Sequence, residues 1–545
     1  MQTIVDALMA HAARTPDRVA LRTMDGASLT WGEWASQSQQ VAGALAAAGV
    51  RPGDRVAVLA ANSLMWPLAD LGALMAGAVS VGLYPTSSAE QVVEVLRDCG
   101  ARVLIVGGAT QLAKALPARA RCEALELVVG WEAAGAHVEP WADWIAAAPA
   151  VVPAHRAPED DAVLIYTSGS TGHPKGARIS HGCLVASARS IAEVLALTSD
   201  DSSLSYLPFG HAAERMFGQS TRIWVGMEAL LVDDPSHVFA AAAQYHPTLF
   251  GGLPRFFEKA HAAFEAAAEL PGTRAERDER LGRVRASHFG TRLRVATSGG
   301  APLSPSIAAA LDARGVRVLG AYGQTEHLCV AMHRPARYNF TTVGLPMPGT
   351  ELCIADDGEV LVKRGPLTFS GYLGRDEETR EAFTADGVWL KTGDLGSVDT
   401  DGFLSITGRK KEILVLSTGK KVAPLPIEAA LGAGPWIEHA MLCGEGHSYV
   451  TALLTVRDAP LRDLAKREGF PGGRGEWLAR AEVRAHVQAQ VDGVNAALST
   501  HEQVKKWVLA PESFSVDGGE LTPPMKLKRH EVAARFASLL NRLYE

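Results

Sequence analysis

The chain has 545 residues, too many for a single hydrophobic core, and its 47% hydrophobic and 21% charged residues are typical of a globular protein with several packed units. A net charge of −7 without a dense lysine and arginine block argues against nucleic acid as a partner. Six cysteines without a C-x-x-C pair or a cysteine–histidine cluster favour a reducing cytoplasm over a disulfide framework or structural zinc.

The first residues, MQTIVDALMAHAARTPDRVA, lack the basic start and continuous apolar core of a signal peptide, and their apolar positions predict an amphipathic helix. The segment from Trp66 to Tyr84 has about the length of a membrane span. Asp70, several glycines and the following Pro85 interrupt it, so we predict a buried helix that turns into a strand. Peripheral membrane contact and oligomerisation stay open.

Short apolar or β-branched runs alternate with alanine-rich helical stretches along much of the chain. The runs begin at Val56, Val103, Leu125, Ala162 and Leu293. This alternation predicts α/β layers with largely parallel strands. The arginine- and glutamate-rich stretch over residues 273–285 is most simply a solvated helix or loop.

The pattern changes at about residue 341. Short strands with Asp-Asp-Gly and Arg-Gly turns predict hairpins in a small β-rich subdomain over residues 341–407, which closes an N-terminal domain of residues 1–407. The remaining residues, 408–545, predict a smaller α+β C-terminal domain that ends in a helix from Arg529 to Tyr544.

A glycine- and hydroxyl-rich loop follows the predicted strand at residues 162–166 and precedes a helical stretch that begins near His181. Such a loop can offer backbone N–H groups, hydroxyls and a lysine to a polyphosphate. The candidate phosphate ligands are Thr167, Ser168, Gly169, Ser170, Thr171, Gly172 and Lys175. The spacing differs from G-x-x-x-x-G-K-[ST], which disfavours a Walker loop; the alternative to a phosphate-binding loop is a surface turn.

The block YTSGSTGHPKGA resembles the signature of the adenylate-forming superfamily, which includes acyl-CoA synthetases, adenylation domains of nonribosomal peptide synthetases and firefly luciferase. Further motifs of that superfamily follow in order: Gly299-Gly300-Ala301-Pro302, Tyr322-Gly323-Gln324-Thr325-Glu326, Trp389-Leu390-Lys391-Thr392-Gly393-Asp394, Gly408-Arg409-Lys410-Lys411-Glu412 and a terminal Lys526. The resemblance covers nearly the whole chain. It implies a large layered N-terminal domain and a mobile C-terminal lid.

The resemblance implies an enzyme that joins a carboxylic acid to AMP, releases pyrophosphate, and passes the acyl group to the thiol of CoA. It places Glu326 and Thr167 at Mg²⁺, Thr325 at the α-phosphate, and Asp394 with Arg409 at the ribose. Tyr322 would stack on adenine, although plain core packing is the alternative for this ring. The residues implied to line the nucleotide beside Tyr322 are Gly300, Ala301, Pro302, Gly323 and Gln324.

Lys526 matches the family lysine that bridges the carboxylate and the α-phosphate, with Lys528 as the alternative in the same basic cluster. Lys411 matches the hinge about which the C-terminal domain rotates to bring Gly419 to the site for thioester formation. This chain has Ser417-Thr418-Gly419 where many relatives have paired glycines.

The block from Tyr206 to Met216 and the ending LTPPMKLKR resemble long-chain acyl-CoA synthetases. His211 would then lie at the carboxylate end of the acyl pocket; the alternative is a histidine held by packing and capping with Glu214. Phe257 would be an aromatic gate and Gly299 part of the acyl pocket. Two other functions stay open: loading of an acyl carrier protein, and a catalytically silent binding protein.

Overall fold

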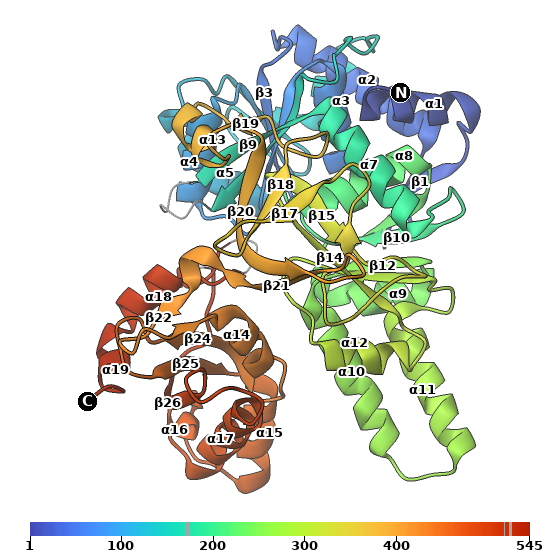
Figure 1. The fold of residues 1–545 in the computed structure, drawn as a ribbon. Coiled ribbons are helices and arrows are strands. Elements are labelled where there is room, and N and C mark those ends of the chain that lie inside the picture. Colours follow the sequence, from blue (N-terminus) through green and yellow to red (C-terminus); the bar gives the residue numbers. More distant parts are fainter. Residues whose placement is uncertain (169–173, 517, 523–525) are drawn as a thin grey trace.

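The computed structural model describes residues 1–168, 174–516, 518–522 and 526–545. Two large sheets with their covering helices form the upper part of the molecule in Figure 1, and a smaller unit that contains the C-terminus lies below them. The architecture is therefore mixed α/β, with a large N-terminal and a smaller C-terminal domain, as the sequence predicts.

The first large sheet has eight described strands, and four of the predicted apolar runs lie in it. Its order is β19 (Gly371–Tyr372), β9 (Pro174–Ser180), β8 (Asp161–Ser168), β4 (Val79–Leu83), β3 (Arg55–Leu59), β5 (Val103–Val106), β6 (Leu127–Gly130) and β7 (Glu139–Pro140). The strands from β8 to β7 are parallel, whereas β9 and β19 are antiparallel additions at one edge. The predicted strands at 56, 103, 125 and 162 are confirmed.

The second large sheet has nine described strands. Its order is β16 (Leu345–Pro346), β15 (His327–Met332), β14 (Val318–Gln324), β13 (Val295–Ser298), β12 (Leu249–Gly252), β10 (Ser202–Ser205), β11 (Glu228–Leu231), β1 (Val19–Thr23) and β2 (Ser28–Thr30). The interior pairs from β14 to β1 are parallel. The carboxyl ends of parallel strands are where α/β sheets bind ligands.

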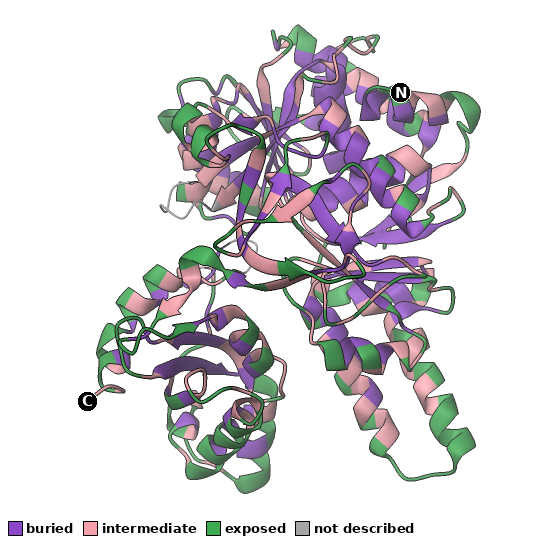
Figure 2. Ribbon diagram, in the orientation of Figure 1, coloured by how far each residue is buried: buried purple, intermediate pink, exposed green. Residues whose placement is uncertain are grey.

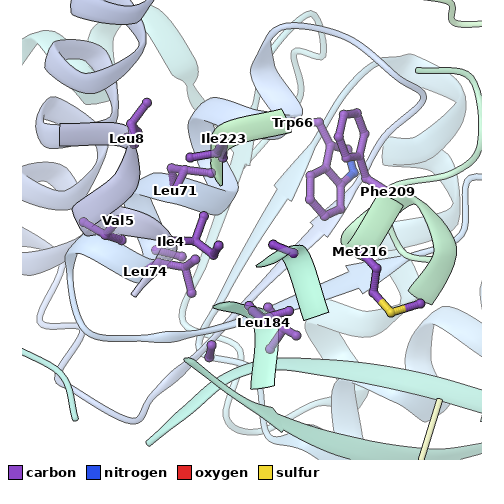
Figure 3. Packing of buried hydrophobic residues seen from close by; sticks show 14 of the residues in the cluster. Ile4, Val5, Leu8, Trp66, Leu71, Leu74, Leu184, Phe209, Met216 and Ile223 are labelled. Atoms are coloured by element: carbon purple, nitrogen blue, oxygen red, sulfur yellow. The ribbon is translucent and has the colours of Figure 1, made fainter. Parts of the chain in front are cut away.

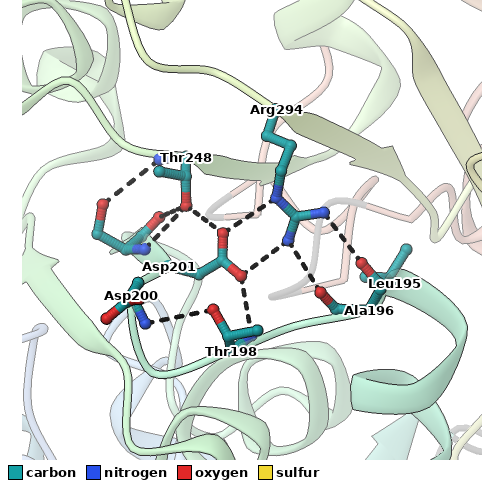
Figure 4. Close-up of polar contacts among 8 residues, drawn as sticks. Leu195, Ala196, Thr198, Asp200, Asp201, Thr248 and Arg294 are labelled. Carbon is teal, nitrogen blue, oxygen red and sulfur yellow. Dashed lines mark hydrogen bonds and ion pairs between the residues drawn. The ribbon is translucent and has the colours of Figure 1, made fainter.

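The opposite, amino ends of β10, β12 and β13 are joined by a polar network (Figure 4). Arg294 donates to both carboxylate oxygens of Asp201, at 3.2 and 2.8 Å, and to the carbonyl oxygens of Leu195 and Ala196. The Thr248 hydroxyl donates to Asp201 at 2.7 Å. Burial would raise the pKa of Asp201, but the Arg294, Thr198 and Thr248 hydrogen bonds lower it below its ordinary value.

Helices cover both sheets and fill the space between them. In the N-terminal part they are α1 (Ile4–Arg14), α2 (Trp31–Ala47), α3 (Met65–Met75), α4 (Ala89–Cys99), α5 (Ala109–Arg121), α6 (Trp141–Ala146), α7 (His181–Leu195), the π-helix η1 (Glu214–Ser220), α8 (Thr221–Val225), η2 (Pro235–His237), α9 (Val238–Tyr245), α10 (Pro254–Glu269), α11 (Arg274–Phe289), α12 (Pro305–Asp312) and α13 (Asp376–Glu381). Helices α10 and α11 project from the body as a pair, largely exposed along α11 (Figures 1 and 2).

Helix α1 begins with a capping box in which Thr3 and Asp6 exchange hydrogen bonds. Its apolar face packs with α3, α7 and α8 in the core drawn in Figure 3, which confirms the amphipathic first helix. Helix α3 is buried along its whole length and leads into β4, as predicted for residues 66–84. Among the described residues, no helix is both long and apolar enough to cross a membrane.

The predicted β-rich segment contains the sheet β17 (Leu352–Ile354), β18 (Glu359–Lys363), β20 (Trp389–Val398) and β21 (Leu404–Arg409). The Asp-Asp-Gly hairpin between β17 and β18 is confirmed. The hairpin expected at the Arg-Gly turn is wrong, because β18 pairs with the distant β20 and the intervening β19 pairs with β9. Strand pairing over such distances leaves no local sequence signal.

The C-terminal domain contains the sheet β24 (Ile437–Cys443), β25 (Val450–Val456) and β26 (Val504–Leu509), and the pair β22 (Leu414–Val415) and β23 (Lys421–Val422). Its helical segments are η3 (Lys410–Glu412), α14 (Pro424–Gly432), α15 (Asp458–Glu468), α16 (Arg474–Leu478), α17 (Ala481–Asn495), α18 (Arg529–Arg535) and α19 (Ala537–Asn541). The single helix predicted over residues 529–544 is wrong: it is broken at Phe536, which packs into a local core with Phe514 and Val532.

Candidate active site

Two of the predicted motifs lie at the carboxyl ends of the neighbouring parallel strands β13 and β14. Gly299 to Pro302 follow β13, and Tyr322 to Gln324 end β14, with Thr325 and Glu326 in the turn to β15. Gly300 has a φ of +81°, a conformation that favours glycine. The buried side-chain atoms Ser298 Oγ and Gln324 Nε2 have no hydrogen-bond partner among the described residues. Unpaired buried polar atoms fit a site that is completed by a polar ligand such as a nucleotide.

The phosphate-loop candidate lies in a hairpin, and the predicted strand–loop–helix order is wrong. Strands β8 and β9 are antiparallel, with Thr167 opposite Lys175 and Ser168 opposite Pro174. Helix α7 begins only after β9, so its amino end is separated from the loop by the length of a strand. Gly169, Ser170, Thr171 and Gly172 lie outside the described residues. The hairpin register itself brings Thr167 and Lys175 together.

Asp394 joins strands β20 and β21 to β14. Its Oδ2 accepts a hydrogen bond from the Tyr322 hydroxyl at 2.6 Å, and its Oδ1 pairs with Arg409 Nε at 3.0 Å. Arg409 lies directly opposite Asp394 in the β20–β21 register. Burial raises the pKa of Asp394, although the Arg409 charge and the Tyr322 hydrogen bond oppose the shift. The motif residues Tyr322, Asp394 and Arg409 therefore form one cluster.

The Glu326 side chain accepts a hydrogen bond from a tyrosine of strand β19. Its Oε1 accepts a hydrogen bond from the Tyr372 hydroxyl at 2.5 Å, and Lys175 Nζ lies 5.6 Å from the centre of the Tyr372 ring. Burial and the Glu326 charge raise the pKa of Tyr372, so its hydroxyl stays protonated and donates.

A hard cation suits this position. Mg²⁺ is usually bound by one or two carboxylates together with substrate phosphates, and Glu326 offers one such carboxylate oxygen. No cluster of three or more acidic, histidine or cysteine ligands occurs in the described part of the chain. A single carboxylate is the kind of protein ligand that Mg²⁺ uses when substrate phosphates supply further oxygens.

Lys526 faces these acidic groups from the C-terminal domain. Its N–H donates to the Thr522 hydroxyl at 3.0 Å and its carbonyl accepts from Thr522 N–H at 2.7 Å. The residue as a whole is exposed, and partial desolvation of its ammonium, followed by the Arg409 charge, lowers its pKa. Glu326 and Asp394 oppose this shift, so the ammonium lies within electrostatic reach of both.

His211 is a neutral donor close to the same lysine. Burial, and then the Lys526 charge, lowers its pKa to about 4. Its Nδ1 accepts a hydrogen bond from the Ala213 N–H at 3.1 Å, which assigns the ring proton to Nε2. Glu214 is not its partner, because the buried Glu214 pairs with Arg222 and Ser205, and the His211 ring packs edge-on against Tyr84.

Phe257 lies on α10 and is completely buried. Its ring centre is 5.9 Å from that of Phe250 and 6.2 Å from that of Phe289, so it belongs to an aromatic core beside Gly252. A gate at this position would require the ring to move. Gly299 follows β13, where an added Cβ would lie 3.1 Å from the Ala321 carbonyl oxygen.

The candidate hinge, Lys411, lies between two residues that are bound to different domains. Lys410 Nζ contacts Asp357 at 2.5 Å and Glu359 at 2.7 Å, both beside or on β18, while Glu412 accepts from Arg529 at 3.3 Å. Gly419 is exposed at the β22–β23 turn with a φ of +76°. The turn therefore requires glycine at this position.

Sequence reasoning missed Tyr372, Ser298 and Asp98. Asp98 on α4 accepts from Tyr166 at 2.6 Å and from Arg375 at 2.8 Å, and so joins β8 to the segment after β19. Strand β19 is only two residues long, with no periodicity to indicate it. For Tyr372, the local sequence signal was an aromatic residue within a short Gly-Tyr-Leu-Gly turn.

These features define an adenylate-forming enzyme fold, in which the predicted nucleotide residues come from the carboxyl ends of β13 and β14 and from β20 and β21. Residues 8–373 match the family described as AMP-binding enzyme, and residues 411–545 match the AMP-binding enzyme C-terminal domain. The chain belongs to the AMP-binding enzyme family.

Among its relatives is the long-chain-fatty-acid–CoA ligase FadD15 of Mycobacterium tuberculosis, 36% identical, with 98% of this chain and 96% of that protein covered. The fold matches the adenylation domain of a carboxylate reductase from Mycobacterium chelonae, with a TM-score of 0.84, 23% identity, and coverage of 99% and 91%. It also matches the anthranilate CoA ligase AuaEII in complex with anthranoyl-AMP, with a TM-score of 0.81, 24% identity and 98% of each chain covered.

Proposed function

We propose that this chain is an ATP-dependent fatty acyl-CoA ligase that forms an acyl-adenylate and transfers the acyl group to CoA. The observation that carries the proposal is the Tyr322–Asp394–Arg409 cluster, with Lys526 of the C-terminal domain within electrostatic reach of Asp394. The similarity to FadD15 over nearly the whole chain supports the fatty acid and CoA as substrates. A catalytically silent homologue is disfavoured because every charged motif residue is present.

Activation brings a carboxylate against the α-phosphate of ATP, so like charges must be neutralised and the reactants held in line. We assign this work to Lys526, whose ammonium is partly desolvated and therefore interacts strongly with anions. We assign a hydrogen bond to the acyl carboxylate to His211 Nε2. Lys175 and Thr167, opposite each other in the hairpin, would hold the departing pyrophosphate.

Asp394 is assigned to the ribose hydroxyls, with Arg409 and Tyr322 fixing its carboxylate. The Tyr322 hydrogen bond fixes the ring beside Asp394, and we assign the ring to stacking on adenine. Glu326 and Thr167 would hold Mg²⁺, which when bound supplies positive charge to the phosphates.

We also propose that residues 1–407 and 408–545 are separate bodies, with the hinge at Lys411. The ion pairs on either side support the hinge position, since Lys410 is bound to Asp357 and Glu359 of the N-terminal body and Glu412 is bound to Arg529 of the C-terminal body. Rotation about Lys411 would withdraw Lys526 after adenylation and present the Gly419 turn for CoA.

We place the chain in the cytoplasm because all six cysteines are unpaired, as in a reducing compartment. A long-chain acid would make peripheral contact with a membrane useful.

The test is exchange of labelled pyrophosphate into ATP, followed by acyl-CoA formation, with a panel of fatty, aryl and bile-type acids. We expect exchange that depends on fatty acid, and acyl-CoA when CoA is added. Silence with fatty acids of every length would overturn the proposal. Transfer to an acyl carrier protein but not to CoA would favour the carrier-loading alternative.

A further inference from the structure

Strand β19 lies between the phosphate-loop hairpin and the turn that carries Glu326. On one side it pairs with β9, with Tyr372 opposite Ala177, and hydrogen bonds from Ser370 and Leu373 continue that pairing. On the other side the Phe369 N–H donates to the Glu326 carbonyl at 3.0 Å. The segment from Phe369 to Leu373 therefore joins the two parts of the site through its backbone.

The Tyr372 side chain makes the same connection through polar atoms. Its hydroxyl donates to Glu326 Oε1 at 2.5 Å, and its ring lies 5.6 Å from Lys175 Nζ. The ring is fixed by edge-on packing against the buried Phe369, at 4.9 Å between centres and 72° between planes. A fixed donor on one carboxylate oxygen leaves the other, Oε2, oriented for a second partner.

A bond of this kind has a known physical consequence at metal sites. A carboxylate that binds a cation through one oxygen is oriented by the hydrogen bond on its other oxygen, and loss of that bond commonly weakens metal affinity by about 10- to 100-fold. The Tyr372 ring also interacts with Lys175, because a cation over an aromatic face is attracted to that face. Tyr372 thus contacts both groups proposed to meet the metal–phosphate unit.

We infer that Tyr372 is a positioning residue for magnesium-bound ATP: its hydroxyl orients Glu326 and its ring holds Lys175, so that carboxylate and ammonium present one geometry. The inference rests on the proposed function of Glu326 and Lys175. Tyr372 itself touches neither the reacting atoms nor the acyl group. Loss of the Tyr372 hydroxyl is therefore expected to reduce the gain in ATP affinity that Mg²⁺ gives. The affinity for ATP without Mg²⁺ should change less.

The experiment is calorimetric titration of the full chain with ATP, with and without Mg²⁺, for the wild type and Tyr372→Phe. We expect the gain in affinity that Mg²⁺ gives to fall about tenfold in Tyr372→Phe. Binding of ATP without Mg²⁺ should stay at the wild-type value, because the ring, its packing and the strand are retained. Urea unfolding of both proteins establishes that the variant is folded.

Tyr245→Phe is the matched control, since its hydroxyl donates to Glu228 at 3.0 Å outside the site. It should leave both titrations unchanged. When Tyr372→Phe is combined with Glu326→Gln, the gain in ATP affinity from Mg²⁺ should fall no further than in Glu326→Gln alone. The inference is overturned if Mg²⁺ raises the ATP affinity of Tyr372→Phe as much as that of the wild type, or if Tyr372→Phe loses the same affinity for ATP with and without Mg²⁺. It is also overturned if adding Tyr372→Phe to Glu326→Gln lowers the Mg²⁺-dependent gain in ATP affinity by a further tenfold.

These outcomes are separable from failure of the proposed function. A wild type that binds magnesium-bound ATP but makes no acyl-CoA would overturn the proposed reaction and leave the Tyr372 titrations readable. A wild type that makes acyl-CoA while Tyr372→Phe keeps its full Mg²⁺ gain would overturn the positioning role alone.

Discussion

The two ends of the nine-stranded sheet are built differently. At the amino ends of β10, β12 and β13, the guanidinium of Arg294 and the carboxylate of Asp201 have several partners within the protein (Figure 4). At the carboxyl ends of β13 and β14, Ser298 Oγ and Gln324 Nε2 are buried without a partner in the described chain. The first end satisfies its charged groups within the protein, whereas the second leaves polar atoms unpaired where the ligand is proposed to bind. Stability and catalysis should therefore be separable by mutation.

The largest expected effect is at the ligand end. Lys526→Ala should slow adenylate formation by about 100- to 1000-fold, because it removes the cation placed where charge develops. Thioester formation from supplied acyl-adenylate and CoA should stay largely intact, and so should the free energy of unfolding. Pyrophosphate exchange and a separate thioester assay measure the two steps. Equal loss in both steps would contradict the assignment.

At the amino end, Asp201→Asn should lower the free energy of unfolding at neutral pH by about 1–3 kcal/mol, because it weakens charge-assisted hydrogen bonds with Arg294 and Thr248. Pyrophosphate exchange should keep its wild-type rate. The pKa of Asp201 is lowered in the folded state, so its stabilisation is complete above the ordinary value near about 4 and is lost as the pH falls through the folded value.

Urea unfolding of the wild type and Asp201→Asn at several pH values checks this sign. The stability difference should shrink as the medium becomes more acidic than about pH 4. A difference that is constant or grows with acidity would show that the carboxylate charge is not what stabilises this end of the sheet.

A smaller effect is expected for Tyr322→Phe. The change removes the hydroxyl that donates to Asp394 but keeps the ring, so the KM for ATP should rise about tenfold. Tyr322→Leu, which also removes the ring, should raise the KM further. If the two variants are equal, stacking on adenine contributes nothing, and the hydroxyl alone explains the position.

The smallest effect is expected for Lys528→Ala, two residues from Lys526. We expect less than about a twofold change in pyrophosphate exchange, since an isolated surface charge contributes little. Lys526 is the lysine whose charge acts on His211 and Asp394. A loss as large as that of Lys526→Ala would transfer the catalytic role to Lys528.

Local sequence determined much of the fold. The apolar runs at Val56, Val103 and Ala162 became parallel strands because both faces are covered by helices, which favours continuous apolar sequence. Strand β9 was not predicted because Pro174 and Gly176 disfavour strands in isolation. Its pairing with β8 turned an expected strand–loop–helix into a hairpin.

For the candidate site, motif resemblance supplied Tyr322, Glu326, Asp394 and Lys526, which the structure gathers from distant parts of the chain. It did not supply Tyr372, because the role of this residue depends on where a two-residue strand pairs. Contacts that arise only from long-range pairing have no counterpart in local periodicity.

The segment around Lys411 also bears on protein engineering. Because Lys410 is bound to Asp357 and Glu359 while Glu412 is bound to Arg529, a recombination joint placed at Lys411 would divide none of these ion pairs between two parents. Each parental half would retain both partners of its own ion pairs. A chimera joined there would mainly have to match the surfaces around Lys526 and around the residues proposed to bind the nucleotide. Libraries of such chimeras could exchange C-terminal domains without redesigning the joint.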